Sequence, residues 1–224
     1  MLTTVALLAA FLAQDAGPGT PRVEAWVGHQ VLKGKRKIPL FGEKETHTEN
    51  FFLAEARFVG HQIQIQQKLC RVEIQPVGSV TASMSPSTVG RLPRSHFTVE
   101  IHGEGKLSAA PWSHGWKDED VDGDGFPGAT VEIRGSSCTG EVYASNQSTT
   151  TLVSGHRTGA GMEGKISVSL SQKILGANGF CLRLIAGDSQ ETQTGSFAYR
   201  KVPLGTSCKT LQGKPWPIKA AGAK

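Results

Sequence analysis

The chain has 224 residues, with 24 Lys or Arg against 19 Asp or Glu, and a formal net charge of +5. This mild basic excess is diffuse and is accompanied by no aromatic–basic strip or recognised binding module, so nucleic acid is not an expected partner. The length is that of one large domain, and beyond the first residues no segment is long and apolar enough to cross a membrane as a helix.

An apolar run from Val5 to Ala13 opens the chain. It is too short to span a bilayer, but it suits the apolar region of a secretory signal, although no basic residue precedes it. We therefore expect residues 1–13 to be a signal peptide, with cleavage after Ala13 or Ala16. The mature protein is then expected to be secreted or periplasmic, without a transmembrane segment.

Alternation of apolar and polar residues predicts the first three strands, at Arg22–Leu32, Thr46–Val59 and His61–Gln75. A basic stretch at 33–37 is expected to form a solvated hairpin turn. Within the third strand the apolar residues change phase at Cys70, which is the pattern that a β-bulge or a strand bend produces.

A less regular stretch rich in Ser, Thr, Pro and Gly follows, with a short helix expected near Ser85–Leu92. Another strand is predicted at 97–102, and then a long loop from Gly103 to Gly128 that carries Trp112 and Trp116. Loops of this length inside compact domains usually have a function or are held in place by other contacts.

The remaining strands are predicted at 131–133, 138–143, 164–171, 180–184 and 197–199 by the same alternation. Between two of them, Gly176-Ala177-Asn178-Gly179 is expected to be a turn, because Asn-Gly suits positive φ angles. Residues 209–224 are expected to form a flexible tail after Cys208.

Four cysteines, an even number without a C-x-x-C pair, predict two disulfides in an exported chain. Three connectivities are possible. Cys181 is out of phase with its apolar neighbours and should face away from the core, where a tail carrying Cys208 could cross. This reasoning favours Cys181–Cys208, which leaves Cys70 with Cys138.

The strongest chemical motif is an acidic stretch at 118–128. Asp120, Asp122 and Asp124, followed at once by Gly125, give the D-x-D-x-D-G spacing of a calcium loop. Alternate carboxylates can converge on one ion, and the glycine allows the sharp turn. The Phe126 carbonyl can add an oxygen. The metal ligands expected from this pattern are Asp118, Asp120, Asp122, Asp124 and Phe126.

This short motif resembles the loops of EF-hand and thrombospondin type 3 proteins. It departs from the EF-hand because Val131 occupies the position of the closing glutamate and Glu132 comes one residue late. Residues 129–134 also alternate like a strand, so no exiting helix is expected. The resemblance therefore implies a structural calcium ion that pins a long loop to a sheet.

The predicted fold is all-β. About eight to ten strands with short turns and one polar face each indicate a single antiparallel up-and-down barrel over residues 14–208, because closing the sheet removes its edges. The architecture resembles lipocalin-like barrels, which implies a closed sheet that holds a small apolar ligand. A β-sandwich is the alternative.

The predicted function is that of an exported binding protein and not an enzyme. It would hold a small apolar ligand or meet a cell-envelope partner, since the sequence contains neither H-E-x-x-H nor Gly-x-Ser-x-Gly. The alternative is a calcium-dependent extracytoplasmic hydrolase of a polysaccharide or other polymer. Its carboxylates would come from Glu100, Glu104 and Glu132. Trp112 and Trp116 could then form a sugar platform, although such residues are more often lids on the core.

Overall fold

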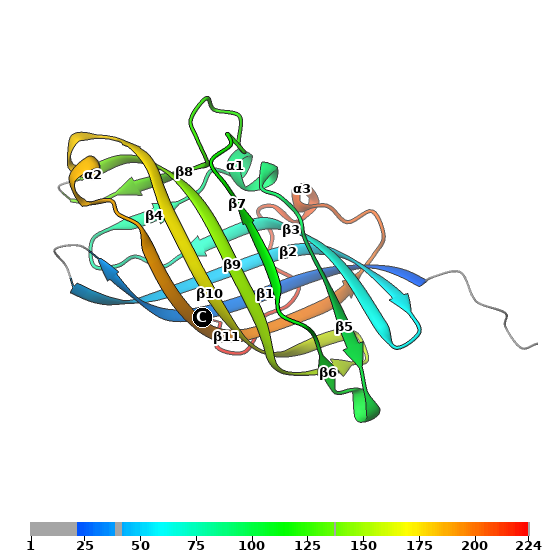
Figure 1. Ribbon diagram of the computed structural model, residues 1–224. Helices are drawn as coiled ribbons and strands as arrows, with labels where there is room; N and C mark the ends of the chain where they lie inside the picture. Colours follow the sequence, from blue (N-terminus) through cyan, green and yellow to red (C-terminus); the bar gives the residue numbers. More distant parts are fainter. Residues whose placement is uncertain (1–21, 39–41, 137, 224) are drawn as a thin grey trace, which may run out of the picture.

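The computed structural model describes residues 22–38, 42–136 and 138–223, which form one antiparallel sheet curled into a half-barrel (Figure 1). The expected signal peptide at residues 1–13 lies outside these residues. In the part of the chain that is described, none of the helices has the length and apolar character needed to cross a membrane.

Strands make up most of the described chain, and the helical segments are short. The strands are β1 (Arg22–Ile38), β2 (Gly42–Val59), β3 (Gln62–Ile74), β4 (Thr81–Ser83), β5 (Ser95–Ile101), β6 (Leu107–Ser108), β7 (Trp112–Trp116), β8 (Ala129–Arg134), β9 (Thr139–Thr158), β10 (Gly161–Asn178) and β11 (Ser189–Val202). The helical segments are α1 (Pro86–Arg91), η1 (Gly103–Gly105), α2 (Phe180–Ile185) and α3 (Cys208–Leu211).

The eleven strands follow the order β4-β8-β9-β10-β11-β1-β2-β3-β5-β6, with β7 also paired to β9. Just before β6, Lys106 forms an isolated bridge with His156 of β9, which brings the β6 edge of the sheet next to β9. The predicted all-β antiparallel fold is confirmed. The sheet is curled into a half-barrel in which β4, β7 and β8 pair out of chain order, so it is not a simple up-and-down barrel. The sandwich alternative is wrong because all these strands share one sheet.

The core lies on the concave face of the sheet. Trp26 is its largest fully buried side chain, and its ring lies 5.9 Å from that of Phe58 and 6.3 Å from that of Tyr199. Because successive strand residues point to opposite faces, the members that one strand contributes to this cluster are separated by an even number of positions, as Ile63 and Ile65 are. Its buried members are Trp26, Leu32, Ala54, Ala56, Ile63, Ile65, Val99, Leu107, Met162, Ile166, Val168, Phe197 and Tyr199.

The predicted change of phase in the third strand is a β-bulge. Phe51 pairs with Arg71 and Phe52 pairs with Leu69, so Cys70 is the extra residue on β3. The bulge separates the two apolar phases of the strand, because a single inserted residue reverses the alternation. This confirms the sequence interpretation at Cys70.

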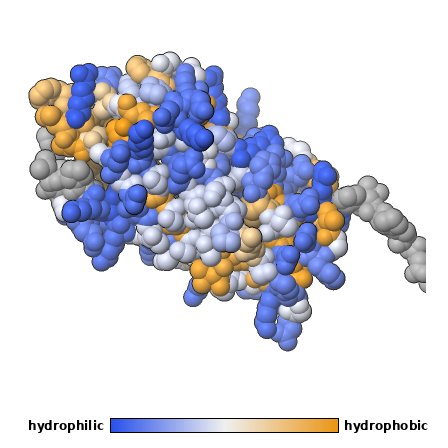
Figure 2. All heavy atoms as spheres, viewed as in Figure 1, coloured by the Kyte–Doolittle hydropathy of each residue, from blue (hydrophilic) through white to orange (hydrophobic). Residues whose placement is uncertain are grey.

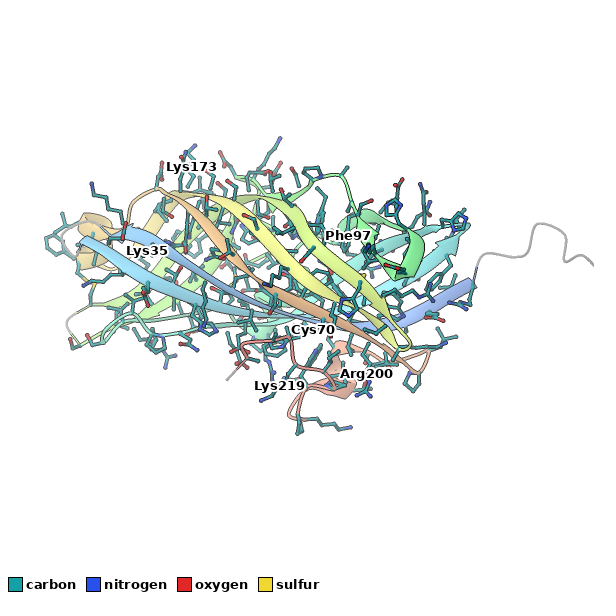
Figure 3. The ribbon with its side chains drawn as sticks, turned by 90° about the horizontal axis from the view of Figure 1, so that it is seen from below. Lys35, Cys70, Phe97, Lys173, Arg200 and Lys219 are labelled. Atoms are coloured by element: carbon teal, nitrogen blue, oxygen red, sulfur yellow. A yellow bond between two sulfur atoms is a disulfide. The ribbon has the colours of Figure 1, made fainter. Side chains whose placement is uncertain are left out.

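Part of the outer face of the sheet is covered by residues 203–223, which we call the C-terminal strap. Figure 3 shows the part of the strap that carries Lys219 on the same side as Cys70 and Arg200. The Trp216 indole nitrogen donates to the Gly28 carbonyl at 3.1 Å, and the Ala220 amide donates to Nδ1 of His29 at 3.0 Å. The segment that we expected to be a flexible tail therefore makes specific contacts with β1.

The favoured disulfide pairing is wrong. The bonds are Cys70–Cys208 and Cys138–Cys181. The error arose because 180–184 was predicted as a strand, whereas these residues belong to the helix α2. Alternation therefore says nothing about the direction in which the Cys181 side chain points.

Helix α2 exposes apolar side chains. Phe180 is 82% exposed and Leu184 is 69% exposed, while Leu182 between them is buried. Positions four apart lie on one face of a helix, which explains why the outer two share the same environment. Apolar residues are visible at the end of the molecule where α2 lies (Figure 2).

The expected long loop at 103–128 is partly strand. It contains β6 and β7, and β7 pairs with β9 from Trp112 opposite Thr150 to Trp116 opposite Asn146. Trp112 stacks on Phe97 with ring centroids 4.4 Å apart, and the Trp116 indole donates to the Ala144 carbonyl at 2.8 Å. Both tryptophans are thus held by contacts with the sheet, as is expected of side chains that cover a core.

Candidate metal centre

The remaining loop, residues 117–128, joins β7 to β8, and we call it the Asp loop. Its two arms are held together because the Gly128 amide donates to the Glu119 carbonyl at 3.0 Å and the Val121 amide donates to the Gly128 carbonyl at 3.1 Å. Gly123 and Gly125 have φ angles of 70° and 90°, a conformation that favours glycine. The glycine spacing therefore permits the tight path that the acidic residues follow.

Asp120 is oriented by backbone amides. Its Oδ1 accepts from Gly123 at 2.6 Å and from Asp124 at 3.2 Å, and its Oδ2 accepts from Gly125 at 2.9 Å. These hydrogen bonds, that from Gly125 first, hold the pKa of Asp120 below its ordinary value. The carboxylate is thus fixed in its ionised form at neutral pH.

Asp122 is the buried member, with only 7% of its surface exposed. Its Oδ2 accepts from the Thr88 hydroxyl of α1 and from the Thr130 amide of β8, both at 3.0 Å. Its Oδ1 is buried and finds no hydrogen-bond partner in the part of the chain that the structure describes. A buried carboxylate oxygen without a partner is rare, because desolvation is not compensated there.

Asp124 completes a group of three carboxylates. Its Oδ1 accepts from the Phe126 amide at 2.9 Å, and its Oδ2 accepts from the Thr130 hydroxyl. One carboxylate oxygen from each of Asp120, Asp122 and Asp124 lies within 4.8 Å of the other two. Calcium–oxygen bonds of 2.3–2.6 Å place ligand oxygens up to about 5 Å apart, so this spacing suits a shared calcium ion.

The other two residues predicted for this site lie differently. Asp118 is largely exposed and pairs with Lys173 at 3.9 Å, outside the group of three. The ring of Phe126 stacks on Tyr143, and a role for its carbonyl as a ligand stays a prediction.

Sequence reasoning missed the groups that seat Asp122. Thr88, which lies 34 residues earlier in the chain, donates to the Asp122 carboxylate. The Arg91 guanidinium donates to the backbone carbonyl of Asp122. No spacing rule connects α1 to the Asp loop, so only the folded chain reveals these contacts. The hydroxyl residues at the start of α1, Ser85–Thr88, were the one available sequence signal for these contacts. Such residues usually indicate a helix N-cap and not a contact with a metal site.

Cations contact the Asp loop at Asp118, which pairs with Lys173, and at the Asp122 carbonyl, which accepts from Arg91. Within the described residues, no Lys, Arg or His side chain forms an ion pair with the three clustered carboxylates. Arg91, the nearest cation to appear in their hydrogen bonds, contacts a backbone carbonyl and not a carboxylate. Three carboxylates in such close contact repel one another unless a cation or protons neutralise them.

The carboxylates proposed for hydrolysis are separate from one another. Glu132 pairs with Arg134 at 3.0 Å and Glu104 pairs with Lys106 at 3.2 Å, both near the surface. These pairs are what solvated strand and turn residues commonly form. They give no support to a pair of convergent catalytic acids.

One surface group has the residue types of a hydrolytic triad. Ser108 Oγ lies 2.6 Å from Nε2 of His102, and a Glu100 carboxylate oxygen lies 4.0 Å from the same nitrogen. A triad requires the acid and the nucleophile to contact opposite ring nitrogens of the histidine. The arrangement therefore does not support nucleophilic catalysis.

The interior leaves little room for a ligand. The cavity on the concave face, lined by Val99, Met162 and Phe197 among others, has a volume of about 10 Å³. Pockets for small organic molecules usually measure about 300–1,000 Å³. A larger groove of about 250 Å³ lies between the strap, at Leu204, and the strands that carry Leu53 and Lys68. Its lining mixes acidic, basic and apolar groups.

Comparison of the chain with protein-family models, with curated proteins and with solved structures finds no match. What the protein does must therefore follow from its own residues. Among the groups described above, the three clustered carboxylates are the ones whose arrangement calls for a ligand.

Proposed function

We propose that the protein is an exported, disulfide-stabilised β-sheet protein that binds Ca²⁺ through Asp120, Asp122 and Asp124. The buried Oδ1 of Asp122, which has no hydrogen-bond partner among the described residues, carries this proposal. It lies on a residue of the three-carboxylate group, where a cation would supply both the missing contact and the missing charge. The two disulfides support a compartment in which such bonds persist.

Calcium suits this donor set better than a transition metal does. All three side chains offer hard oxygen atoms, and imidazole or thiolate donors are the ligands that favour zinc or copper. Calcium also accepts irregular coordination with six to eight oxygens, so the Phe126 carbonyl and water can complete the sphere.

The proposed ion has a structural role, which is to hold the Asp loop against the sheet. Asp122 already links α1 through Thr88 and β8 through Thr130. An ion at its free oxygen would tie both elements to Asp120 and Asp124 of the same loop. Calcium would then resist opening of the Asp loop away from the sheet.

A partner in the cell envelope would meet the outer surface of the molecule. The interior cavity of about 10 Å³ is too small to support the apolar-ligand hypothesis. The proposed role is accordingly that of a calcium-stabilised module that presents its surface to another component.

Thermal unfolding with calcium tests the proposal. We compare the wild type with Asp122→Asn/Asp124→Asn in 10 mM Ca²⁺ and in excess chelator, and use Asp118→Asn as the matched control. At a dissociation constant of about 10⁻⁴ M, 10 mM calcium adds about 2.7 kcal/mol of stability. This corresponds to a rise of roughly 5–10 °C in Tm for a chain of this size.

The double variant should lose this rise and the control should keep it. A wild type whose Tm is the same in calcium and in chelator, and which gives no heat in calorimetric titration, would overturn the proposal. Equal loss of the response in Asp118→Asn would show that diffuse negative charge, and not the clustered site, is responsible.

A further inference from the structure

The C-terminal strap is held to the outer face of the sheet by contacts along its length. Near its start, Cys208 is bonded to Cys70 of β3. In its middle, Trp216 donates to the Gly28 carbonyl and packs edge-on against Phe51, with ring centroids 5.4 Å apart. Near its end, the Ala220 amide donates to His29. The first attachment is covalent, and the last depends on a titratable ring.

His29 is 1% exposed and uses both of its ring nitrogens. Nε2 lies 2.9 Å from a carboxylate oxygen of Glu49, and Nδ1 lies 3.0 Å from the Ala220 nitrogen. A backbone amide only donates, so Nδ1 must carry a lone pair. The carboxylate only accepts when it is ionised, so Nε2 must carry the proton. One neutral tautomer alone satisfies both contacts.

We propose that His29 is a proton-operated latch, and that protonation of its Nδ1 releases residues 212–223 of the strap from the outer face of the sheet. The added proton turns Nδ1 into a donor that faces the donor of Ala220. Ala220 is 4% exposed, so its amide cannot turn to water while the strap stays docked. The Cys70–Cys208 bond keeps the released segment tethered.

Charged groups of β2 and β3 act on this ring, and β11 and the strap carry further charged groups. Strand β2 contributes Glu49 and His47, whose Nε2 lies 3.4 Å from the other oxygen of Glu49. The remaining groups are Arg71 and Glu73 of β3, Arg200 of β11, which donates to the Pro217 carbonyl, and Lys219 of the strap.

The balance of these effects favours the latched state at neutral pH. Burial is the largest effect and lowers the pKa of His29 below its ordinary value, whereas Glu49 raises it by less. The ring is therefore neutral at pH 7, and acidification below the ordinary histidine range charges it. The proton must enter at Nδ1, because Nε2 already holds one.

The other hydrogen bonds that hold this part of the strap are exposed or only partly buried. The Ser196 hydroxyl donates to the Ala221 carbonyl, Arg200 to the Pro217 carbonyl and Trp216 to the Gly28 carbonyl. Ile218, Ala220 and Ala223 pack on Val31 and Ala198, and most of these side chains are small. Beneath them lies an apolar strip of β1 and β2 that includes Val27 and Phe51, both buried. Release at acid pH would expose this strip and would free the Trp216 ring from Phe51.

Hydrogen exchange of residues 212–223 at pH 7.5 and pH 5.0 tests the latch, after correction for intrinsic exchange rates. The wild type should show protection at pH 7.5 and exchange about tenfold or more faster at pH 5.0, as a locally opened segment does. His29→Asn keeps an acceptor oxygen near the position of Nδ1 and does not titrate, so its strap should stay protected at both pH values. His156→Asn, an exposed histidine, is the matched control and should behave as the wild type.

A second variant keeps the test decisive if His29→Asn fails to fold. Ala220→Pro removes the donor from the strap without changing the sheet, so exchange of the strap should be fast at both pH values. The latch is overturned if the wild-type strap keeps its protection at pH 5.0. It is also overturned if His29→Asn loses protection at pH 5.0 as the wild type does, or if Ala220→Pro leaves the pH response intact.

Discussion

The ring of Phe126 lies parallel to the ring of Tyr143, with centroids 4.2 Å apart and 5° between the planes. Phe126 follows the last clustered carboxylate by two residues, and Tyr143 belongs to β9. The stack therefore fastens the far end of the Asp loop to the sheet, in addition to the contact that Asp122 makes with Thr88. A loop held at both ends is preorganised for an ion.

Phe126→Ala should lower the free energy of unfolding by about 1 kcal/mol, since stacked aromatic pairs contribute about 0.5–1.5 kcal/mol beyond burial. It should also weaken calcium binding severalfold, because ordering the loop then opposes binding. Urea denaturation in chelator measures the first effect and calorimetric titration the second. Phe126→Tyr keeps the stack and should resemble the wild type in both. Unchanged calcium affinity in Phe126→Ala would show that the stack does not contribute to calcium binding.

The two disulfides should differ in their effect on stability. They close loops with sequence separations of 138 and 43 residues, and loop entropy favours the longer by about 1 kcal/mol. Cys70→Ser/Cys208→Ser should therefore destabilise more than Cys138→Ser/Cys181→Ser, and each should cost about 2–5 kcal/mol. Urea denaturation of both double variants measures the difference. The reverse order would mean that native contacts of α2 outweigh the loop entropy.

Alternation predicted the all-β sheet and the bulge at Cys70, because the pleat imposes a period of two on any strand with one wet face. It was less informative at β1, where Trp26 and Val27 are both buried. Trp26 and Val27 point to opposite faces of β1. The concave core covers the face of Trp26, and the strap covers the other face. The strap comes more than 180 residues later in the sequence, so no local pattern could reveal it.

The candidate site was predictable only where its residues are close in sequence. The D-x-D-x-D-G spacing predicts Asp120, Asp122 and Asp124 as a group, and the structure places them together. The same reasoning included Asp118, which pairs with Lys173 on β10 because its side chain lies outside the turn. The period of two also misled at α2, since six residues are too few to separate a strand pattern from a helical one.

Glu24 should contribute to the acid sensitivity of the fold. Burial raises its pKa, but hydrogen bonds from Lys201 and Trp26 and the nearby Arg22 outweigh burial, and the net pKa lies below the ordinary value of 4.5. The unfolded chain therefore binds a proton at higher pH than the folded chain does. The stability that the ionised group contributes is present above pH 4.5 and is lost as the pH falls through the folded pKa.

Glu24→Gln should lower the free energy of unfolding at pH 7 by about 1 kcal/mol, an upper value for ion pairs near the surface. It should also lose less stability than the wild type between pH 5 and pH 2. Tm measured across this range checks both effects. Glu55→Gln, an exposed partner of Arg57 at 4.0 Å, is the control and should change neither quantity. Parallel pH curves for wild type and Glu24→Gln would contradict the assignment.

Tyr199 should determine much of the alkaline limit of the fold. Its hydroxyl is buried and donates to the side-chain oxygen of Gln67. Burial raises its pKa far above 10, so the unfolded chain loses this proton first and stability falls as pH rises past 10. Tyr199→Phe should cost about 1–3 kcal/mol at pH 7, because Gln67 keeps a buried oxygen without a donor. Its stability should then decline less than that of the wild type from pH 9 to pH 11.

Tyr143→Phe is the matched control for this prediction. The Tyr143 hydroxyl makes only a long contact, 3.4 Å, with a carboxylate oxygen of Glu141. A weak contact contributes little to stability. At pH 7, Tyr143→Phe should therefore lower the free energy of unfolding by much less than Tyr199→Phe does, as measured by urea denaturation. Equal losses in the two variants would show that the buried Tyr199–Gln67 hydrogen bond is not the source of the effect. The ring of Tyr199 would then act through its packing against Trp26 and Phe197.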